Sequence, residues 1–458
     1  MGESRQERRA NRGGVAGVGH RAWARVIAVV AVAGLCASGS VGPRCLAGEP
    51  ADEDERFVVI RAGRVITNVG DEVRNGVIVV SGGTIRSVGK GLEYPLSATV
   101  IDARDRVVMP GLINPHSRNG LPRYGRGGVH GDLTVAEEYF PLADAHEDLL
   151  KAGYTAVALV PAGQGIPGRA MIVRTGGDED GRTLQSPAYL RVTADKRLLR
   201  GALARAKKEI EKVETARKEF EKKREETRKE REKKAKEAKG KKPEKEKEGE
   251  KPAATQPAKE PAFKPPPIDP AHKVLVDLIQ KKPGVFALVE LGNASDYEHM
   301  QEVLAKHEIA HHFLARNHRQ SDLEYVVEKL GRDEAKIILQ PEMGRVPYSA
   351  ERLHLVRVFS EAGCEVSLMP VGDRASEYAQ MFGRLAELVR AGWSREAALK
   401  SVTLHPARLL GLDKRLGSIE QGKDADFVFL DGDPLDPTVR VQAVMIGGQI
   451  VHEAEGDE

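Results

Sequence analysis

Short apolar runs punctuated by glycine dominate the chain from Phe57 to Ile101, in FVVIRAGRVIT, NGVIVVSGGTIRSVG and SATVIDA. β-Branched Val and Ile fit a pleated surface, and glycine supplies the positive φ that tight turns need. The pattern therefore predicts a meander of antiparallel strands. It returns near the C-terminus in DADFVFLDGDP and VQAVMIGGQIVHE. We expect a small β-sandwich domain assembled from both ends of the chain, residues 57–110 and 411–453.

The middle of the chain has a different period. Helical patterns such as YEHMQEVLAKHE, SDLEYVVEKLG and SAERLHLVRVFSEAG separate several nearly continuous apolar runs. These strand-like runs are Gly111 to Pro115, Thr155 to Val160, Ala170 to Arg174, Val285 to Leu291, Ala310 to Leu314, Lys336 to Leu339 and Glu365 to Met369. Apolar strands that alternate with amphipathic helices are typical of a parallel sheet covered by helices.

The length of this middle region favours a barrel. Without a charged insert, roughly 230 residues remain between Gly111 and Leu410, near the size of a (β/α)₈ unit. We therefore predict the α/β class, with a (β/α)₈ TIM-like barrel over residues 111–410. A doubly wound open sheet is the structural alternative.

A charged helical and Pro-rich insert occupies residues 200–270 within the predicted barrel. Its first turns carry an apolar stripe at helical spacing, formed by Leu199, Leu203, Ala206, Ile210, Val213 and Phe220. Beyond Phe220, Lys, Arg and Glu interleave at spacings that permit i,i+4 ion pairs, as in coiled coils, until the Pro-rich stretch Lys251 to Pro270. We expect a solvent-exposed helix and a disordered linker. An arm that binds a polyanion is the alternative, and raised salt would weaken such binding.

Charge is unevenly distributed along the 458 residues. The formal net charge is +3, but residues 1 to 47 hold seven Arg and two Glu, and Lys207 to Lys251 hold 20 basic and 14 acidic side chains. The remaining 44 basic and 52 acidic groups give a net charge of −8, which argues against a nucleic-acid partner. Three cysteines are too few for a disulfide framework, and Cys364 is expected to be buried packing.

The first 47 residues read as an export signal. An Arg-rich start precedes the apolar stretch Val26 to Ala37, and small residues then lead to a cleavage site near Ala47. We expect an exported protein, periplasmic or extracellular. An uncleaved N-terminal anchor is the alternative, although about a dozen apolar residues fall short of the roughly 20 that a membrane span needs. No later segment is apolar enough to cross a bilayer.

The string DARDRVVMPGLINPHSRNG, residues 102–120, carries the strongest chemical signal. A strand leaves the small sheet domain, turns at Pro110 and Gly111, and runs toward His116. A His at the carboxyl end of the first barrel strand lies where barrel enzymes place their ligands. No GxSxG elbow occurs, and GQGIPG lacks a following GK[ST], so a serine hydrolase of that fold and a phosphate loop are both poorly supported.

This string resembles the entry motif PGLIDxHxH of the amidohydrolase superfamily. The C-terminal stretch TLHPARLLGLDKRLGSIEQGKDADFVFLDGDPLDPTVRVQAVMIGGQIV is similar to that family's ending. The resemblance covers roughly Phe57 to Val451, and it is closest to the composite-domain type that includes imidazolonepropionases and dihydroorotases. It implies one or two divalent metals, zinc or similar, that activate water for attack on a carbon–nitrogen bond other than a peptide bond.

The resemblance also implies a set of site residues, which this chain supplies incompletely. His116 matches the first His of the HxH pair, but Arg118 replaces the second, and a guanidinium cannot ligate a metal. Glu290 replaces the fifth-strand His. The sixth strand offers His318, with His311 and His312 as rivals, and Asp373 falls at the eighth-strand Asp that ligates the metal and accepts a proton. No bridging Lys can be assigned. Glu290 and Arg118 could form a buried ion pair in place of the metal charge.

Two functional hypotheses follow. The first is a hydrolase of non-peptide carbon–nitrogen bonds that uses Asp373 for catalysis and His116, His318, Asp373 and Glu290 as metal ligands. The second is a catalytically inactive descendant, a pseudoenzyme that serves as a binding or scaffold protein and needs no metal. The substrate of the hydrolase would be a small molecule that the sequence does not specify. A homo-oligomer is compatible with either hypothesis.

Overall fold

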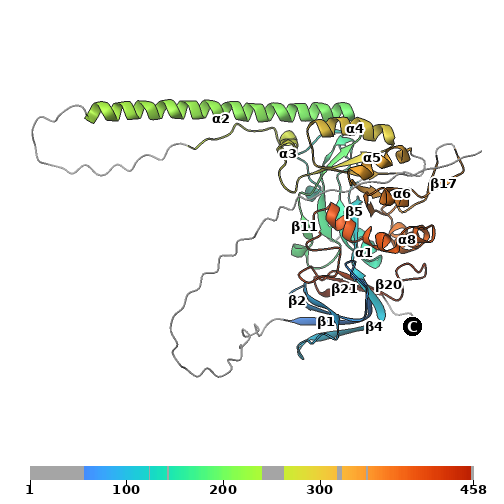
Figure 1. The fold of residues 1–458 in the computed structure, drawn as a ribbon. Helices are drawn as coiled ribbons and strands as arrows, with labels where there is room; N and C mark the ends of the chain where they lie inside the picture. The colour runs from blue at the N-terminus through green and yellow to red at the C-terminus, as the bar shows by residue number, and fades with distance from the viewer. Residues whose placement is uncertain are drawn as a thin grey trace, which may run out of the picture. The chain divides into compact units, whose positions relative to one another are not determined.

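The computed structural model describes residues 56–122, 124–141, 144–239, 262–316, 322–346 and 349–454. The predicted export signal, most of the predicted Pro-rich linker and His318 lie outside these residues. Figure 1 gives the order of the elements along the chain.

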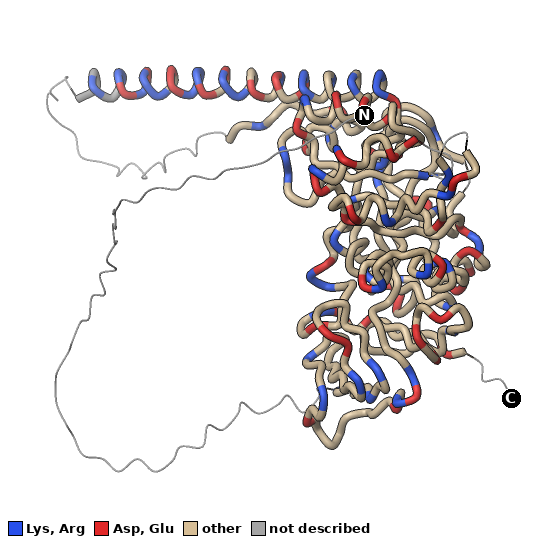
Figure 2. Tube along the Cα trace, turned by 45° about the vertical axis from the view of Figure 1, so that its right-hand side comes forward, with Lys and Arg blue, Asp and Glu red and all other residues tan. Residues whose placement is uncertain are grey.

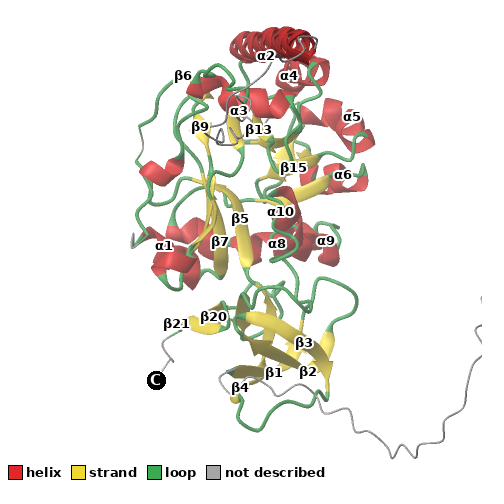
Figure 3. Ribbon diagram, turned by 90° about the vertical axis from the view of Figure 1, so that its left-hand side faces the viewer, coloured by secondary structure: helices red, strands yellow, loops and turns green. Residues whose placement is uncertain are grey.

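Both ends of the described chain contribute to one seven-stranded sheet, in the order β21-β20-β19-β4-β1-β2-β3. Only β1 and β4 pair in parallel; the other neighbours are antiparallel. Figure 3 shows β20 and β21 beside the N-terminal strands. The strands are β1 (Phe57–Val65), β2 (Val73–Ser81), β3 (Thr84–Lys90), β4 (Thr99–Pro110), β19 (Phe427–Leu430), β20 (Val441–Ile446) and β21 (Gln449–Glu453). Ile60, Ile78 and Phe427 lie in its buried core.

The middle of the chain forms two further sheets, ordered β11-β10-β7-β5 and β18-β15-β14-β13-β12-β9. Their strands are β5 (Leu112–Ser117), β7 (Tyr154–Leu159), β9 (Gly168–Arg169), β10 (Met171–Arg174), β11 (Thr183–Gln185), β12 (Leu190–Thr193), β13 (Ala287–Leu291), β14 (His311–Ala315), β15 (Lys336–Leu339) and β18 (Glu365–Leu368). Short pairs join β6 (Gly128–Val129) to β8 (Gly165–Ile166), and β16 (Gly344–Arg345) to β17 (Arg352–Leu353). The predicted strand-like runs are all strands, and β12 is one that the pattern missed.

The α/β class is confirmed, but the described ladders do not form one sheet of eight parallel strands. β5 and β7 are parallel in the first sheet, and β12, β13, β14, β15 and β18 are parallel in the second. Between these groups, β9 and β10 run antiparallel to β12 and β7. The physical reason is the loop PAGQGIPGRA, residues 161–170, where Gly163, Gly165 and Gly168 all have positive φ and reverse the chain.

The two sheets adjoin at both edges. On one side the chain passes from β9 directly into β10, and the Ala170 amide donates to the Tyr189 carbonyl at 2.9 Å. On the other side, residues 401–402 lie between β18 and β5: Leu368 N–H donates to Ser401 O at 2.8 Å, and Ile113 N–H donates to Val402 O at 2.9 Å. Residues 401–402 therefore bridge the edge strands β5 and β18.

Gly111 fixes the path from the terminal sheet into β5. A Cβ at this position would lie 2.1 Å from Thr155 Oγ1, so only glycine fits where the chain passes β7. The motif Pro-Gly-Leu therefore has a packing reason that is independent of any chemistry.

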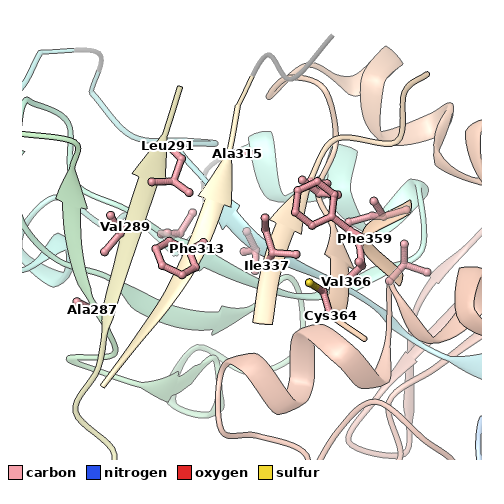
Figure 4. Close-up of a cluster of buried hydrophobic side chains, with 14 of the residues drawn as sticks. Ala287, Val289, Leu291, Phe313, Ala315, Ile337, Phe359, Cys364 and Val366 are labelled. Atoms are coloured by element: carbon pink, nitrogen blue, oxygen red, sulfur yellow. The ribbon is translucent and has the colours of Figure 1, made fainter. Parts of the chain in front are cut away.

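Helices cover the outer face of the parallel strands. They are α1 (Ala145–Lys151), α3 (Pro270–Ile279), α4 (Ala294–Lys306), α5 (Val327–Arg332), α6 (Leu355–Glu361), α7 (Ala375–Ala379), α8 (Met381–Arg390) and α9 (Arg395–Lys400), with 3₁₀ turns at Val135–Glu137, Glu179–Gly181 and Leu323–Val326. The helix α10 (Leu404–Leu409) instead packs Ala407 and Leu409 against the opposite face, in one cluster with Ile113 and Leu288. Figure 4 shows Phe313, Phe359 and Cys364 in the buried layer beneath the covering helices. Cys364 is buried, as predicted, and burial raises the pKa of its thiol to about 12.

The helix α2 (Lys196–Lys239) begins on the body of the protein and continues away from it (Figure 1). Leu199, Ala202, Leu203 and Ala206 are buried, whereas the residues just beyond Phe220 are exposed. Figure 2 shows acidic and basic residues interleaved along this exposed part, and Arg217 pairs with Glu221 one turn away. Within the described residues, none of the helices combines the length and the apolar character needed to span a bilayer.

A pH-dependent stability follows from His312, which stacks on Phe286 with ring centroids 4.8 Å apart. Burial, followed by the charge of Lys336, lowers its pKa to about 3, so the imidazole is neutral in the folded protein. The unfolded chain takes up a proton below about pH 6.5, and stability therefore falls as the pH decreases from about 6.5 toward 3.

We expect His312→Phe to reduce this acid sensitivity, because the ring contact is kept and the titration is removed. Melting temperatures between pH 7 and pH 4 check the prediction. The other histidines titrate in both proteins, so they cancel in the comparison. If the melting temperature fell by the same amount between pH 7 and pH 4 in the wild type and in His312→Phe, the prediction would be contradicted.

Candidate functional site

Strand alternation selects the side chains that face the interior of the parallel strands. On β13, Ala287, Val289 and Leu291 pack under the helices, whereas Leu288 belongs to the opposite, interior cluster. Glu290 shares the face of Leu288 because successive side chains alternate. The same rule places Arg191 of β12 on the face of Tyr189. The carboxyl ends of these strands therefore direct the Glu290 carboxylate and the Arg191 guanidinium into the interior.

Arg191 and Glu290 form a two-point ion pair in this interior. Arg191 Nε donates to Glu290 Oε1 at 2.6 Å, and Nη2 donates to Oε2 at 3.2 Å. Arg191 Nη1 also donates to the carbonyls of Pro161 and Gly163, at 2.7 and 3.0 Å. Arg191 is only 8% exposed, and a planar guanidinium suits this fork-like pairing with a carboxylate. Sequence reasoning missed Arg191, since β12 itself was not predicted.

His116 lies beside this pair. Its Nε2 is 3.4 Å from Glu290 Oε1 but makes no hydrogen bond, and its Nδ1 is 3.3 Å from the Tyr189 hydroxyl, which donates to Pro115 O. Burial lowers the pKa of His116 well below its ordinary value, and the charges of Arg316, Arg191 and Arg118 lower it further. The imidazole is therefore neutral, and three guanidinium groups act on it.

Asp373 lies at the end of β18, next to the end of β5. Its Oδ1 accepts from the Ser117 hydroxyl at 2.6 Å and from the Tyr378 hydroxyl at 3.2 Å, and its Oδ2 accepts from the Arg118 amide at 3.1 Å. Asp373 is exposed, so its carboxylate can meet water and a bound ligand. Neither Ser117 nor Tyr378 carried a recognisable signal in the sequence.

Arg118 is not the partner of Glu290, which corrects the predicted ion pair. Its Nη1 donates to Val160 O at 2.9 Å, and its Nη2 donates to Pro122 O. The physical reason is strand pairing. β12 lies directly beside β13, and from it Arg191 reaches both carboxylate oxygens of Glu290. Burial also lowers the pKa of Arg118, followed by the charge of Arg191.

The histidines of β14 lie away from these groups. His311 and His312 are at the amino end of the strand, and His311 contacts Ile309 O and Gln301 Oε1 at 2.7 and 3.1 Å. They are therefore not ligands at the carboxyl end, where Arg316 follows the strand. His318 lies outside the described residues, so its role stays a prediction.

The described residues do not fit a divalent metal ion. Of the three predicted ligands that the structure describes, it brings together only His116 and Glu290, and both oxygens of Glu290 already accept from Arg191. Asp373 instead contacts Ser117 and Tyr378. In the part of the chain that the structure describes, no three His, Cys, Asp or Glu side chains form a group that could hold a metal. Guanidinium groups near His116 would repel a divalent cation.

The Arg191–Glu290 pair predicts a specific stability effect. We expect Arg191→Met to lower the free energy of unfolding by about 3 kcal/mol, because Glu290 would keep a charge in a mostly buried position without its partner. The double variant Arg191→Met/Glu290→Met should recover much of this loss. Urea denaturation measures both values. Arg104→Met removes an exposed arginine that pairs with Asp102, and this control should change little. Equal losses in the single and double variants would contradict the prediction.

A second prediction concerns metal. We expect the purified protein to bind less than one equivalent of zinc, manganese or iron, and EDTA to leave its melting temperature unchanged, because Arg191 occupies the carboxylate that a metal would need. Elemental analysis and thermal melts check this. A stoichiometric metal whose removal lowers the melting temperature would contradict it and would point to His318 as a ligand.

Residues 356–451 match the sequence model of the Amidohydrolase family. N-acetylglucosamine-6-phosphate deacetylase of Rattus norvegicus is 50% identical over 68 residues, 15% of each chain. 5'-Deoxyadenosine deaminase of Methanococcoides burtonii is 37% identical over 82 residues, 18% of each chain. Imidazolonepropionase of Erwinia tasmaniensis is 62% identical over 37 residues, covering 8% of this chain and 9% of the relative. The chain thus matches less than a fifth of the length of these relatives.

The fold extends this likeness. A solved amidohydrolase from Thermotoga maritima superposes with a TM-score of 0.67 over 87% of this chain and 100% of its own, at 20% sequence identity. The expected family resemblance is confirmed: residues 356–451 match the amidohydrolase family in sequence, and the fold of most of the chain is similar to that of a solved amidohydrolase.

Proposed function

We propose that this protein is a hydrolase of carbon–nitrogen bonds other than peptide bonds, acting on a small molecule. The family match and the relatives named as a deacetylase and a deaminase support this class of reaction. They do not favour the non-catalytic alternative. We also propose that the protein is exported, on the evidence of its N-terminal sequence alone.

The scaffold of the proposed enzyme is a distorted (β/α)₈ barrel. In this proposal the two α/β sheets are its two parts, and the β9–β10 segment takes the place of one parallel strand. The adjoining sheet edges and the likeness to the Thermotoga maritima amidohydrolase support it. Barrel enzymes carry their reactive groups at the carboxyl ends of the strands, where Asp373, Arg191 and Glu290 lie.

The observation that carries the proposal is the position of Asp373. Its carboxylate is exposed and is held by the Ser117 hydroxyl, the Tyr378 hydroxyl and the Arg118 amide. A carboxylate fixed in this way can accept a proton from an attacking water molecule. No step is assigned to a metal, because the described ligands do not fit one.

The test is a hydrolysis screen with the purified protein. The panel contains an N-acetylated amino-sugar phosphate, 5'-deoxyadenosine and imidazolone propionate, the compounds that the names of the relatives suggest. Release of acetate or ammonia, or opening of the imidazolone ring, measures turnover.

We expect Asp373→Asn to reduce kcat/KM for any substrate found by about 10²- to 10⁴-fold, because proton transfer contributes a factor of this size. Asp71→Asn, at an exposed position in the terminal sheet domain, is the matched control and should keep full activity. Turnover that survives Asp373→Asn would remove the proposed role of Asp373. A protein that hydrolyses none of the panel, or related amides and amidines, would favour the non-catalytic alternative.

A further inference from the structure

A cavity of about 670 Å³ opens at the carboxyl ends of β12, β13 and β14. Its lining includes Thr193, Asp195, Lys196, Glu290 and Arg316. Pockets that hold small ligands usually enclose about 300–1,000 Å³, so this volume suits a metabolite-sized molecule. The first residues of α2 form one wall, because Asp195 and Lys196 stand where that helix begins.

Within the described residues, the charges that line the cavity are compensated, with the exception of Arg316. Glu290 is paired with Arg191, and Lys196 is paired with Glu302. Asp195 caps the start of α2 by accepting from the Leu198 amide at 2.9 Å. Arg316 is half-buried, and its Nε is enclosed and has no hydrogen-bond partner within the described residues.

The surroundings add to this positive charge. Arg191 lies on β12, which pairs with β13, and β13 pairs with β14, the strand that Arg316 follows. Glu290 is not free to pair with Arg316, because it already accepts two hydrogen bonds from Arg191, and Asp373 accepts from the Ser117 hydroxyl and the Arg118 amide. A ligand with a negative group would complete the pairing of Arg316.

We propose that this cavity binds a small molecule through an oxyanion group, a carboxylate or a phosphate, held by the guanidinium of Arg316. A guanidinium presents paired N–H donors in the geometry of two oxyanion oxygens. The Thr193 hydroxyl, 2.6 Å from the Gly165 amide, borders the same space and can orient the rest of the ligand. The proposal adds a ligand class to the proposed hydrolase, and binding is measurable without any turnover.

The experiment measures saturable binding by the full-length protein. Inorganic phosphate and acetate are titrated separately at constant ionic strength, with chloride as the balancing anion, and binding is followed by calorimetry and by the melting temperature. Binding of phosphate alone identifies a phosphate ligand, binding of acetate alone identifies a carboxylate ligand, and binding of both identifies a general oxyanion site. A response equal to that in chloride would overturn the proposal.

Variants locate the site. We expect Arg316→Gln to weaken the binding about tenfold or more, because it removes charge-assisted hydrogen bonds, and Arg316→Lys to retain part of the affinity. Arg197→Gln removes the same charge from an exposed position one residue beyond Lys196, and it should bind as the wild type does. Equal binding by wild type and Arg316→Gln would overturn the proposal. If Arg316→Gln does not fold, the comparison of Arg316→Lys with Arg197→Gln decides, and equal affinity in these two would overturn it.

The proposed hydrolase activity and the proposed oxyanion site can be rejected independently of each other. Loss of anion binding in Arg316→Gln together with an inactive wild type would leave an anion-binding protein without hydrolase activity. Turnover in a protein that binds neither anion would support the hydrolase and reject the oxyanion site.

Discussion

The buried pair of Arg191 and Glu290 is the constraint on which the interior of this protein depends. A guanidinium removed from water needs a full set of acceptors, and Arg191 finds them in one carboxylate and two backbone carbonyls. Once Glu290 is engaged in this way, it is no longer a free ligand. His116 beside it stays neutral and buried. A positive charge carried by the chain itself thus lies beside His116 and Glu290, two residues that the family resemblance predicts as metal ligands.

The loop of residues 161–170 shapes both the strand order and the surroundings of Arg191. Residues 161–170 reverse the chain and produce the antiparallel β9 and β10, and they also supply the Pro161 and Gly163 carbonyls to Arg191. Gly163 is needed here because a Cβ would lie 1.9 Å from Arg126 O. The antiparallel pairing of β9 and β10 and two of the acceptors of the buried guanidinium therefore depend on the same loop.

Two polar regions result at the strand ends, and they suit different tasks. Asp373 is exposed and is held by donors from β5 and from Tyr378, an arrangement suited to proton transfer. The cavity at β12 to β14 contains Arg316, whose Nε has no hydrogen-bond partner among the described residues, an arrangement suited to holding a negatively charged group. An enzyme needs both, one group to react and another to orient the substrate.

The sequence by itself determined the α/β class, most of the strands and the positions of His116, Glu290 and Asp373, because strand and turn preferences are local and the end motifs are specific. It did not reveal β12, a short strand with a buried arginine in its centre, and it assigned Glu290 to Arg118. Only the tertiary structure decided that Arg191 is the partner, since this depends on which strands are neighbours. Arg316 likewise looked like one of many arginines in the sequence. That its Nε is enclosed without a partner among the described residues is a property of the packed strand ends, and no local pattern encodes it.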